Sequence, residues 1–430
     1  MNKDRICIFW FRRDLRLNDN HALWQALQSK YPVLPIFIFD DHFFKQFTPN
    51  DKRFNLIYDQ LFQINNTLKA YNSVIQIYKG KPTEIFHQLI KKYEIAGVFC
   101  NEDYEAFAIK RDHEIKTMLE KVGIPFSTFK DQVIFHKNEI LKNDGKPYTI
   151  YTPYKNKWLS LFSIEKIKTF PSEKFLHKLY QHNTLFPDKK SLGIINNDYH
   201  VKPINLEVIP TYEKYRDYPY RSGTSNASVH LRFGLISIRE LIQKTLSINQ
   251  HYINELIWRE FFMQILYHFP HVEHSNFNPK FNTLEWSNNE KHFELWTKGQ
   301  TGYPLVDAGI RELNATGYMH NRVRMVVASF LTKHLFIDWR WGEAYFAQHL
   351  LDYELGSNNG NWQWAASTGC DAVPYFRIFN PSSQLKKFDK NFEYIKQWIP
   401  DYNPANYIAP IVNHEEARIR TLMAFKKCAK

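Results

Sequence analysis

The sequence predicts an α/β N-terminal domain with a doubly wound parallel sheet, followed by an all-α C-terminal domain. From residue 5 to about 130, short apolar runs (ICIFWF, VLPIFIFD, VIQIY, GVFCN) alternate with longer stretches of helical spacing such as NLIYDQLFQINNTL. This alternation is typical of βαβ units on a parallel sheet. Beyond Tyr212, long helical patterns follow one another, among them YINELIWREFFMQILYHF, VDAGIRELNAT, NRVRMVVASFLTKHLF and GEAYFAQHLLDYEL.

We therefore predict three ranges: an α/β domain over 1–130, a long connector with some short helices over 131–210, and a helical domain over 211–430. The connector carries scattered Pro, Asn and Lys and has weaker periodicity. Doubly wound sheets often bind nucleotides, yet neither GxGxxG nor GxxxxGK[ST] occurs in the first range. The sheet prediction therefore implies no ligand by itself.

The composition points to a basic protein with many aromatic side chains. The formal net charge is +12, and 16% of the residues are aromatic, more than a core needs. A basic surface attracts polyanions, most often nucleic acid, although a Lys-rich solubilising surface remains an alternative. Four cysteines without a CxxC pair suggest neither disulfides nor a metal site. With no signal peptide and no membrane segment in the sequence, we expect a cytoplasmic monomer.

Four helical or loop segments carry polar groups suited to binding. Glu255, Trp258 and Arg259 share one helix face by their spacing, where a carboxylate, an indole and a guanidinium could receive a nucleobase. A surface Glu–Arg pair beside a core Trp explains the same pattern. The stretch from Gly317 to Met325 predicts a turn leading into a helix, with Asn321, Arg322 and Arg324 in its first turn. The two arginines lie on opposite faces, so each could serve a different anion.

The densest segment runs from Asp352 to Trp364, DYELGSNNGNWQW. We predict a carboxylate-bearing helix end, an Asn/Gly turn and a Trp-rich stretch, forming a polar loop able to hold a heterocycle. A helix cap with two core tryptophans is the alternative. Residues 223–228, GTSNAS, form a small-hydroxyl loop that could cradle phosphates, though such loops are more often caps or turns.

Four motifs resemble the photolyase/cryptochrome family, and most closely its bacterial class I cyclobutane pyrimidine dimer photolyases: FWFRRDLRLNDNHAL, NELIWREF, TGYPLVDAGIRELNATGYMHNRVRM and SNNGNWQWAASTGCDAVPYFRIFNP. The resemblance covers nearly the whole chain. It implies an antenna-type first domain, a helical FAD-binding domain, and light-driven repair of pyrimidine dimers in UV-damaged DNA by an electron from excited reduced FAD.

The resemblance also implies roles for individual residues. Those matching FAD contacts are Tyr212, Thr224, Ser225, Asn226, Ala227, Ser228, Arg324, Asp352, Glu354 and Asn358, with Asn358 near flavin N5. Those matching DNA or lesion contacts are Arg216, Glu255, Trp258, Arg259, Asn321, Arg322, Met325, Trp364 and Gln384. The tryptophans matching an electron relay to the flavin are Trp286, Trp339 and Trp362.

The chain departs from the family pattern at several positions. The usual Arg-Leu of the phosphate loop is Asn226-Ala227, Glu354 replaces an Asp, and Tyr252 stands where a Trp is common. A second, antenna chromophore is implied without a fixed identity, because Ala108 occupies the position of a Glu in folate-binding members.

Three other functions fit parts of the same pattern. A cryptochrome-type photosensor shares the fold but repairs nothing, repair of the (6-4) photoproduct goes with a His pair where this chain has His320-Asn321, and a plain DNA-binding module would lack flavin.

Overall fold

The protein is described here from a computed structural model, which covers residues 4–429. The chain divides into two compact units, each interrupted in sequence. Unit 1 comprises Met1–Glu139, Leu161–Lys202 and Ala227–Lys244, and unit 2 comprises Ile140–Ser160, Pro203–Asn226 and Thr245–Lys430. The predicted connector therefore contributes to both units, whereas the predicted domain limits at 130 and 210 remain a prediction.

Unit 1 contains a five-stranded sheet in the order β3-β2-β1-β4-β5, with every adjacent pair parallel. Its strands are β1 Arg5–Phe11, β2 Val33–Asp40, β3 Gln76–Gly80, β4 Glu94–Asn101 and β5 Phe126–Phe129. The order runs outward from β1 in both directions, which confirms the predicted doubly wound sheet.

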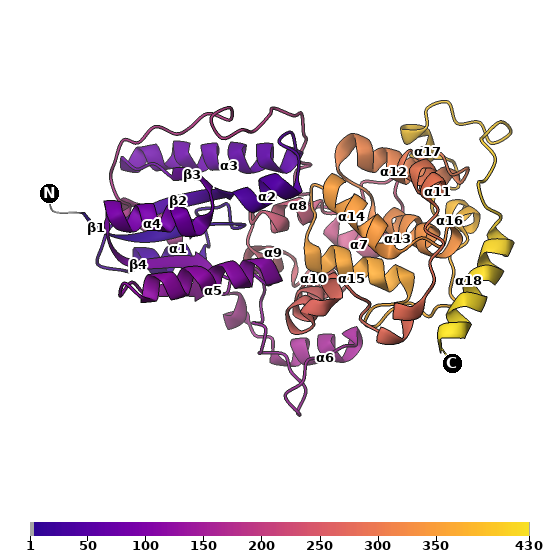
Figure 1. Ribbon diagram of the computed structural model, residues 1–430, viewed down its shortest axis with the longest axis horizontal. Helices are drawn as coiled ribbons and strands as arrows, with labels where there is room; N and C mark the ends of the chain where they lie inside the picture. Colours follow the sequence, from indigo (N-terminus) through magenta and orange to yellow (C-terminus); the bar gives the residue numbers. More distant parts are fainter. Residues whose placement is uncertain (1–3, 430) are drawn as a thin grey trace. The chain divides into compact units, whose positions relative to one another are not determined.

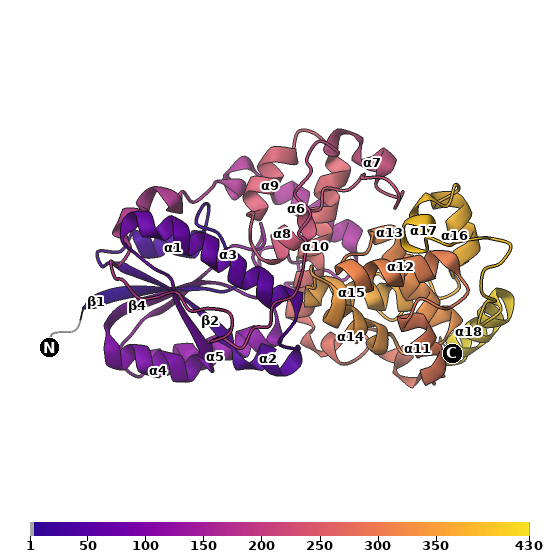
Figure 2. The same cartoon turned by 90° about the horizontal axis from the view of Figure 1, so that it is seen from above.

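Helices cover both faces of this sheet, as Figure 2 shows, with α1 and α3 on one side and α4 and α5 on the other. The helices of unit 1 are α1 His21–Leu27, α2 Asp41–Gln46, α3 Lys52–Leu68, α4 Pro82–Lys92, α5 Ala106–Glu120 and α8 Ala227–Arg232, with α9 Ile238–Thr245 ending at the unit boundary. Alternate β1 residues Ile6, Ile8 and Trp10 pack with Phe86 of α4 and Ile115 of α5. Because both faces are covered, the central strand β1 and its neighbour β2 are almost continuously apolar and buried.

A buried ionic network joins three segments of unit 1. Asp131 accepts from Arg16 Nη2 at 2.7 Å and from Arg239 Nη2 at 2.7 Å, and Asp19 pairs with Arg239 at 2.9 Å. All four side chains are at most 5% exposed. The network ties the segments that follow β1 and β5 to α9, and the two guanidiniums hold the pKa of Asp131 down to about 2 against the effect of its burial.

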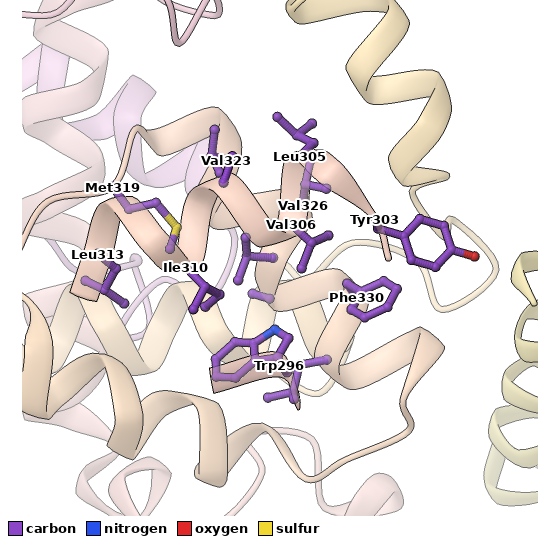
Figure 3. Close-up of a cluster of buried hydrophobic side chains, with 14 of the residues drawn as sticks. Trp296, Tyr303, Leu305, Val306, Ile310, Leu313, Met319, Val323, Val326 and Phe330 are labelled. Carbon is purple, nitrogen blue, oxygen red and sulfur yellow. The ribbon is translucent and has the colours of Figure 1, made fainter. Parts of the chain in front are cut away.

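Unit 2 is helical, as predicted (Figure 1). Its helices are α6 Tyr151–Leu161, α7 Tyr212–Tyr215, α10 Gln250–His268, α11 Glu290–Thr297, α12 Pro304–Thr316, α13 Asn321–Ser329, α14 Trp339–His349, α15 Leu355–Ala366, α16 Pro381–Phe388, α17 Glu393–Trp398 and α18 His414–Ala429. Side chains of α12 and α13 pack around Trp296 and Phe330 in the core (Figure 3).

Two of the predicted patterns fold differently. NRVRMVVASFLTKHLF was expected to be one helix, but α13 ends at Ser329 and a π-helical turn, Phe330–His334, follows. The helix predicted over GEAYFAQHLLDYEL corresponds to α14, which ends at His349, so Asp352 follows the helix rather than closing it. None of the helices among residues 4–429 is long and apolar enough to cross a membrane.

The predicted polar loop after Asp352 is wrong, because residues 355–366 form the helix α15 with Glu354 at its N-cap position. Asn and Gly are poor helix formers, so packing must stabilise this helix. A Cβ at Gly356 would lie 3.2 Å from the carbonyl oxygen of Phe262 on α10, and one at Gly360 would lie 2.1 Å from the Phe262 ring. The two glycines, four residues apart on one face, let α15 approach α10 closely.

Candidate cofactor and DNA site

A cavity in unit 2 gathers many of the residues singled out from the sequence. It encloses about 590 Å³, part of it open to solvent, between α13, α14, α15 and the segment that joins α14 to α15. The predicted site residues on its wall are Asn321, Arg324, Met325, Asp352, Glu354, Asn358, Trp362 and Trp364. Predicted flavin contacts and predicted lesion contacts thus line one cavity.

Ion pairs fix two of its charged side chains. Arg324 Nη2 donates to both oxygens of Asp352, at 3.1 and 2.9 Å, and its Nε donates to the carbonyl oxygen of Met319 at 2.8 Å. Glu354 pairs with Arg259 of α10 at 3.3 Å. The cavity therefore presents a guanidinium and a carboxylate whose orientations are set before any ligand arrives.

Asn358 carries its amide on the buried side of α15. Its Nδ2 donates to Glu343 Oε1 at 2.7 Å and to the Glu343 carbonyl oxygen at 3.1 Å. Burial, with a smaller contribution from Glu273, raises the pKa of Glu343 to about 7 although the Asn358 hydrogen bond lowers it. Glu343 therefore holds the Asn358 side chain in place with a carboxyl group that titrates near neutral pH.

A second cluster of charged side chains includes Glu255 of α10. Arg216 pairs with Glu255, and Arg322 donates to Asp217 at 2.8 Å. The Arg322 guanidinium also lies 4.6 Å from the centre of the Phe388 ring on α16. Gln384 is one turn before Phe388 and its Oε1 is buried without a hydrogen-bond partner among the described atoms. Arg322 and Arg324 thus pair with different carboxylates of the protein, and the different ligands that their spacing suggests stay a prediction.

Trp258 is supported by a residue from the predicted connector. Its ring stacks on Tyr151 of α6 at 3.6 Å between centroids and 9° between planes. The Tyr151 hydroxyl donates to the Asn254 carbonyl oxygen at 2.7 Å, and the Tyr151 N–H donates to Asp371 at 3.0 Å. One face of the Trp258 indole is therefore already covered by Tyr151, and the rings of Phe262 and Phe261 lie 5.5 and 5.7 Å from its centre.

The small-hydroxyl loop is anchored to the start of α10. The Tyr252 hydroxyl donates to Ser225 Oγ at 2.9 Å, and Tyr212 packs edge-on against the Tyr252 ring at 5.2 Å. Asn226 has a left-handed backbone, with φ of 56°, which Asn tolerates better than most residues. Gly223, Thr224, Ser225 and Asn226 belong to unit 2, whereas Ala227 and Ser228 begin α8 of unit 1.

The three predicted relay tryptophans belong to one apolar cluster. Trp362 and Trp339 are buried in it, and Trp286 packs against it while partly exposed. The Trp362 ring lies against Gly342, where an added Cβ would be 2.1 Å from it, and Gly342 is one turn from Trp339 on α14. Trp286 contacts Phe336 at 5.0 Å. Trp362 therefore lines the cavity, Trp339 is buried and Trp286 is partly exposed, while the relay through them stays a prediction.

The lining residues fit FAD. Arg324, Asp352 and Asn358 supply polar groups of both signs for a heterocycle with ring N–H and carbonyl groups, while Trp362, Phe346 and Leu350 supply apolar surface. Tyr252 holds the hydroxyl loop and Arg259 holds Glu354, seven residues apart and on one face of α10. Two helical turns, about 10 Å, thus separate a loop suited to phosphate from a cavity suited to a ring.

Sequence reasoning missed Asp217, Glu343 and Tyr151. Each acts on a predicted residue through a contact between segments far apart in sequence, for instance 107 residues between Tyr151 and Trp258. Local spacing carries no signal for such contacts. The apolar alternation of TIYTPYKNKWLSL could have suggested only that an aromatic helix, α6, needed a partner.

Two family models match the chain: residues 7–173 match "DNA photolyase", and residues 252–405 match "FAD binding domain of DNA photolyase". Proteins named deoxyribodipyrimidine photo-lyase are similar over their whole length. The one from Vibrio cholerae is 34% identical, covering 97% of this chain and 99% of the relative, and that from Escherichia coli is 34% identical, covering 98% and 99%.

Solved structures agree with these matches. A bacterial class III photolyase from Agrobacterium tumefaciens superposes with a TM-score of 0.88 at 30% identity, covering 100% of this chain and 98% of that one. An archaeal photolyase from Sulfolobus tokodaii, described with two FAD molecules, gives 0.79 at 33%, covering 98% and 99%. A Synechocystis cryptochrome at 23% identity, with a TM-score of 0.84 and coverage of 99% and 100%, shares the fold. The chain belongs to the DNA photolyase/cryptochrome family.

Proposed function

We propose that this protein is a light-driven DNA repair enzyme, a deoxyribodipyrimidine photo-lyase that splits cyclobutane pyrimidine dimers with FAD as cofactor. The observation that carries the proposal is the shared cavity, since Arg324, Asp352 and Asn358 line it together with Asn321, Met325 and Trp364. A lesion that enters this cavity would lie beside the flavin. The names of the full-length relatives support the same activity.

When bound and reduced, FAD supplies the photoexcited electron that opens the cyclobutane ring and accepts it again afterwards. The protein supplies binding, orientation and exclusion of water. The Arg324–Asp352 pair and the Asn358 amide hold the polar edge of a ring system, and the buried apolar wall of Trp362 and Phe346 keeps water from it. On the lesion side, Glu255 offers a carboxylate to a base N–H, and Arg322 reaches a phosphate or a base oxygen.

The dimer must leave the duplex to reach the cavity, and photolyases are among the standard examples of base-flipping enzymes. Extrusion costs a few kcal/mol, least for a damaged site. Stacking on an aromatic ring offsets about 1–3 kcal/mol per base. Trp258 and Trp364 are the indoles placed to provide it, and Tyr151 keeps Trp258 in one orientation. The balance favours a lesion over intact, well-stacked pyrimidines.

The net charge of +12 supports sequence-independent attraction to the phosphate backbone. The affinity for DNA should therefore fall steeply as salt rises. In this proposal the protein acts on UV-damaged DNA as a monomer in the cytoplasm. An antenna chromophore in unit 1 would add light absorption and take no part in the chemistry.

The test is repair of an oligonucleotide that carries one thymine dimer. The reduced protein is illuminated with near-UV or blue light, and recovery of thymine absorbance is compared with a dark sample and with Trp398→Phe, an indole of α17 outside the cavity lining. We expect light-dependent recovery in both proteins. A flavin-loaded, fully reduced sample without recovery would contradict the proposal, and repair of a (6-4) photoproduct or light-induced signalling would then be tested.

A further inference from the structure

If Trp362 loses an electron, either of two other tryptophans, Trp296 or Trp339, could replace it and so take over the positive charge. The indole N–H groups of these two tryptophans have different surroundings. Trp296 is fully buried, and its ring centre lies 6.3 Å from that of Trp362. Trp339, 1% exposed, lies on α14 one turn before Gly342, against which the Trp362 ring rests. Distance alone does not favour Trp339 over Trp296.

The hydrogen bonds of the two indoles separate them. Trp339 Nε1 donates to Asn276 Oδ1 at 2.8 Å, and Asn276 is itself only 3% exposed. Asn276 is held in turn by its backbone N–H, which donates to Asn282 Oδ1 at 3.3 Å. Trp296 Nε1 is buried and, among the atoms described between residues 4 and 429, has no hydrogen-bond partner (Figure 3 shows its apolar surroundings).

An acceptor on the N–H matters because an indole that loses an electron becomes a cation whose N–H is a far stronger donor. The hydrogen bond to a charged group is about twice as strong as one between neutral groups. The amide oxygen of Asn276 therefore stabilises a positive charge on Trp339, whereas Trp296 would have to hold the charge in an apolar core without compensation.

A cation also faces Trp339. The Arg340 guanidinium lies 5.0 Å from the Trp339 ring centre and opposes a second positive charge there. Asp338 pairs with this guanidinium at 2.7 Å and offsets part of the repulsion. With Arg340 nearby, the ring of Trp339 is a poor site for a positive charge unless its N–H is bound by an acceptor.

We propose that Asn276 is a positioning residue of the electron relay, which directs the positive charge from Trp362 to Trp339 and away from Trp296 by accepting the Trp339 indole hydrogen bond. The inference rests on the proposed function, because it assumes that FAD bound in the cavity is photoreduced through Trp362.

The electrons balance along the path. With FAD bound and photoexcited, Trp362 would give up one electron, and one electron would then leave the Trp339 ring for Trp362, while the Nε1 proton of Trp339 stays in its hydrogen bond to Asn276. Trp286 passes an electron to Trp339, and a soluble thiol reductant refills Trp286. No bond to carbon is made or broken in these steps.

The experiment measures photoreduction of the flavin-loaded protein in thiol buffer, by steady-state flavin absorbance and by transient absorption of the oxidised indoles. Asn276→Leu removes the acceptor at similar size, and Asn276→Gln keeps an amide. We expect Asn276→Leu to slow the charge transfer to Trp339 at least about tenfold, as the loss of a hydrogen bond to a charged group implies, and Asn276→Gln to recover part of the rate.

A third variant is expected to have the opposite effect on Trp339, because it strengthens the acceptor instead of removing it. Asn276→Asp places a carboxylate at the Trp339 N–H, so transient absorption should show faster formation of the deprotonated indole radical at Trp339. A purely structural role for Asn276 would not produce this spectral change. Retained flavin and an unchanged unfolding midpoint in each variant exclude misfolding as the cause.

The choice between the two indoles is tested by adding Trp296→Phe. In the natural sequence this change should leave the yield of photoreduction unaltered, whereas with Asn276→Leu it should lower the yield further. An unchanged rate in Asn276→Leu, while Trp339→Phe abolishes photoreduction, overturns the role of Asn276 alone. Full photoreduction in Trp339→Phe and in Trp362→Phe contradicts the relay. Failure of the proposed function is read separately, as absence of bound flavin or of light-driven repair by the reduced protein.

Discussion

Arginine–carboxylate groups occur in both units, and their surroundings differ. In unit 1, Asp131 binds Arg16 and Arg239, and all three side chains are at most 5% exposed. In unit 2, Arg324 binds Asp352, but the guanidinium remains 28% exposed and faces a cavity. The first group is enclosed by the protein, whereas the guanidinium of the second keeps part of its surface open to a ligand.

The comparison shows that pairing alone does not indicate function. A fully enclosed ionic network fixes chain segments, and removing one partner leaves a buried charge. A pair at a cavity wall orients a charge toward a ligand, and its loss is compensated by water. Burial therefore predicts whether a substitution affects folding or binding.

The largest effect is expected for Asp131→Ala. Arg16 and Arg239 would lose their shared carboxylate in a dry interior, so the free energy of unfolding should fall by about 3–5 kcal/mol. Urea denaturation measures this. Asp144→Ala, at an exposed carboxylate, should change stability by no more than about 0.5 kcal/mol. Equal effects of the two changes would refute the structural role of the network.

Arg324→Ala should act on the cofactor instead. Loss of the guanidinium at the cavity wall should weaken flavin retention at least about tenfold, the value of one charge-assisted hydrogen bond, while stability of the flavin-free protein changes little. Flavin absorbance after extensive dialysis gives the result. Arg311→Ala, at a guanidinium bound to the Gly299 carbonyl oxygen, is the control and should retain flavin. If both variants keep flavin equally, Arg324 does not contact it.

Trp258→Ala should weaken lesion binding by about 1–3 kcal/mol, the worth of one stacked base. Glu255→Ala should also weaken it, because Glu255 is proposed to accept from a base N–H. Both should keep flavin, since neither residue lines the cavity. Band-shift titrations with damaged and undamaged oligonucleotides separate the affinity for the lesion from the general affinity for DNA. Loss of flavin in either variant would place the residue on the cofactor side.

The smallest effect concerns Glu343. Its pKa is raised by burial from 4.5 to about 7, so between these values the folded protein keeps a proton that the unfolded chain has released. Stability should therefore decline as pH rises from about 4.5 to 7. Glu343→Gln should remove this decline, as thermal unfolding at several pH values would show. An unchanged slope would mean that Glu343 ionises normally.

Four strands of unit 1 were predictable because β1 and β2 are nearly continuous apolar runs and β3 and β4 overlap shorter ones, whereas β5, FSTF, carries none. The helix α10 was predictable because its pattern is long. The helix α15 was not, since Asn and Gly favour turns locally and only the contact of Gly356 and Gly360 with Phe262 makes the helix stable. The break in α13 at Phe330 has no marker in the sequence pattern.

Some residues of the candidate site could likewise be predicted from the sequence, and others could not. Arg322 and Arg324 were assigned to different ligands from their spacing, and the structure gives them different carboxylates. The supporting residues Tyr151, Asp217 and Glu343 could not be found, because a stack or hydrogen bond between distant segments leaves no periodicity. The spacing of a motif predicts which residues share a face, but not what that face meets.

The helix α10 sets the distance between the anchored hydroxyl loop and the ring cavity, since Tyr252 and Arg259 are seven residues apart on one face. An insertion of one residue between them would rotate Arg259 by about 100° away from Glu354 and lengthen the span by about 1.5 Å. We therefore expect the length of the segment 252–259 to matter for any ligand that reaches both the hydroxyl loop and the cavity.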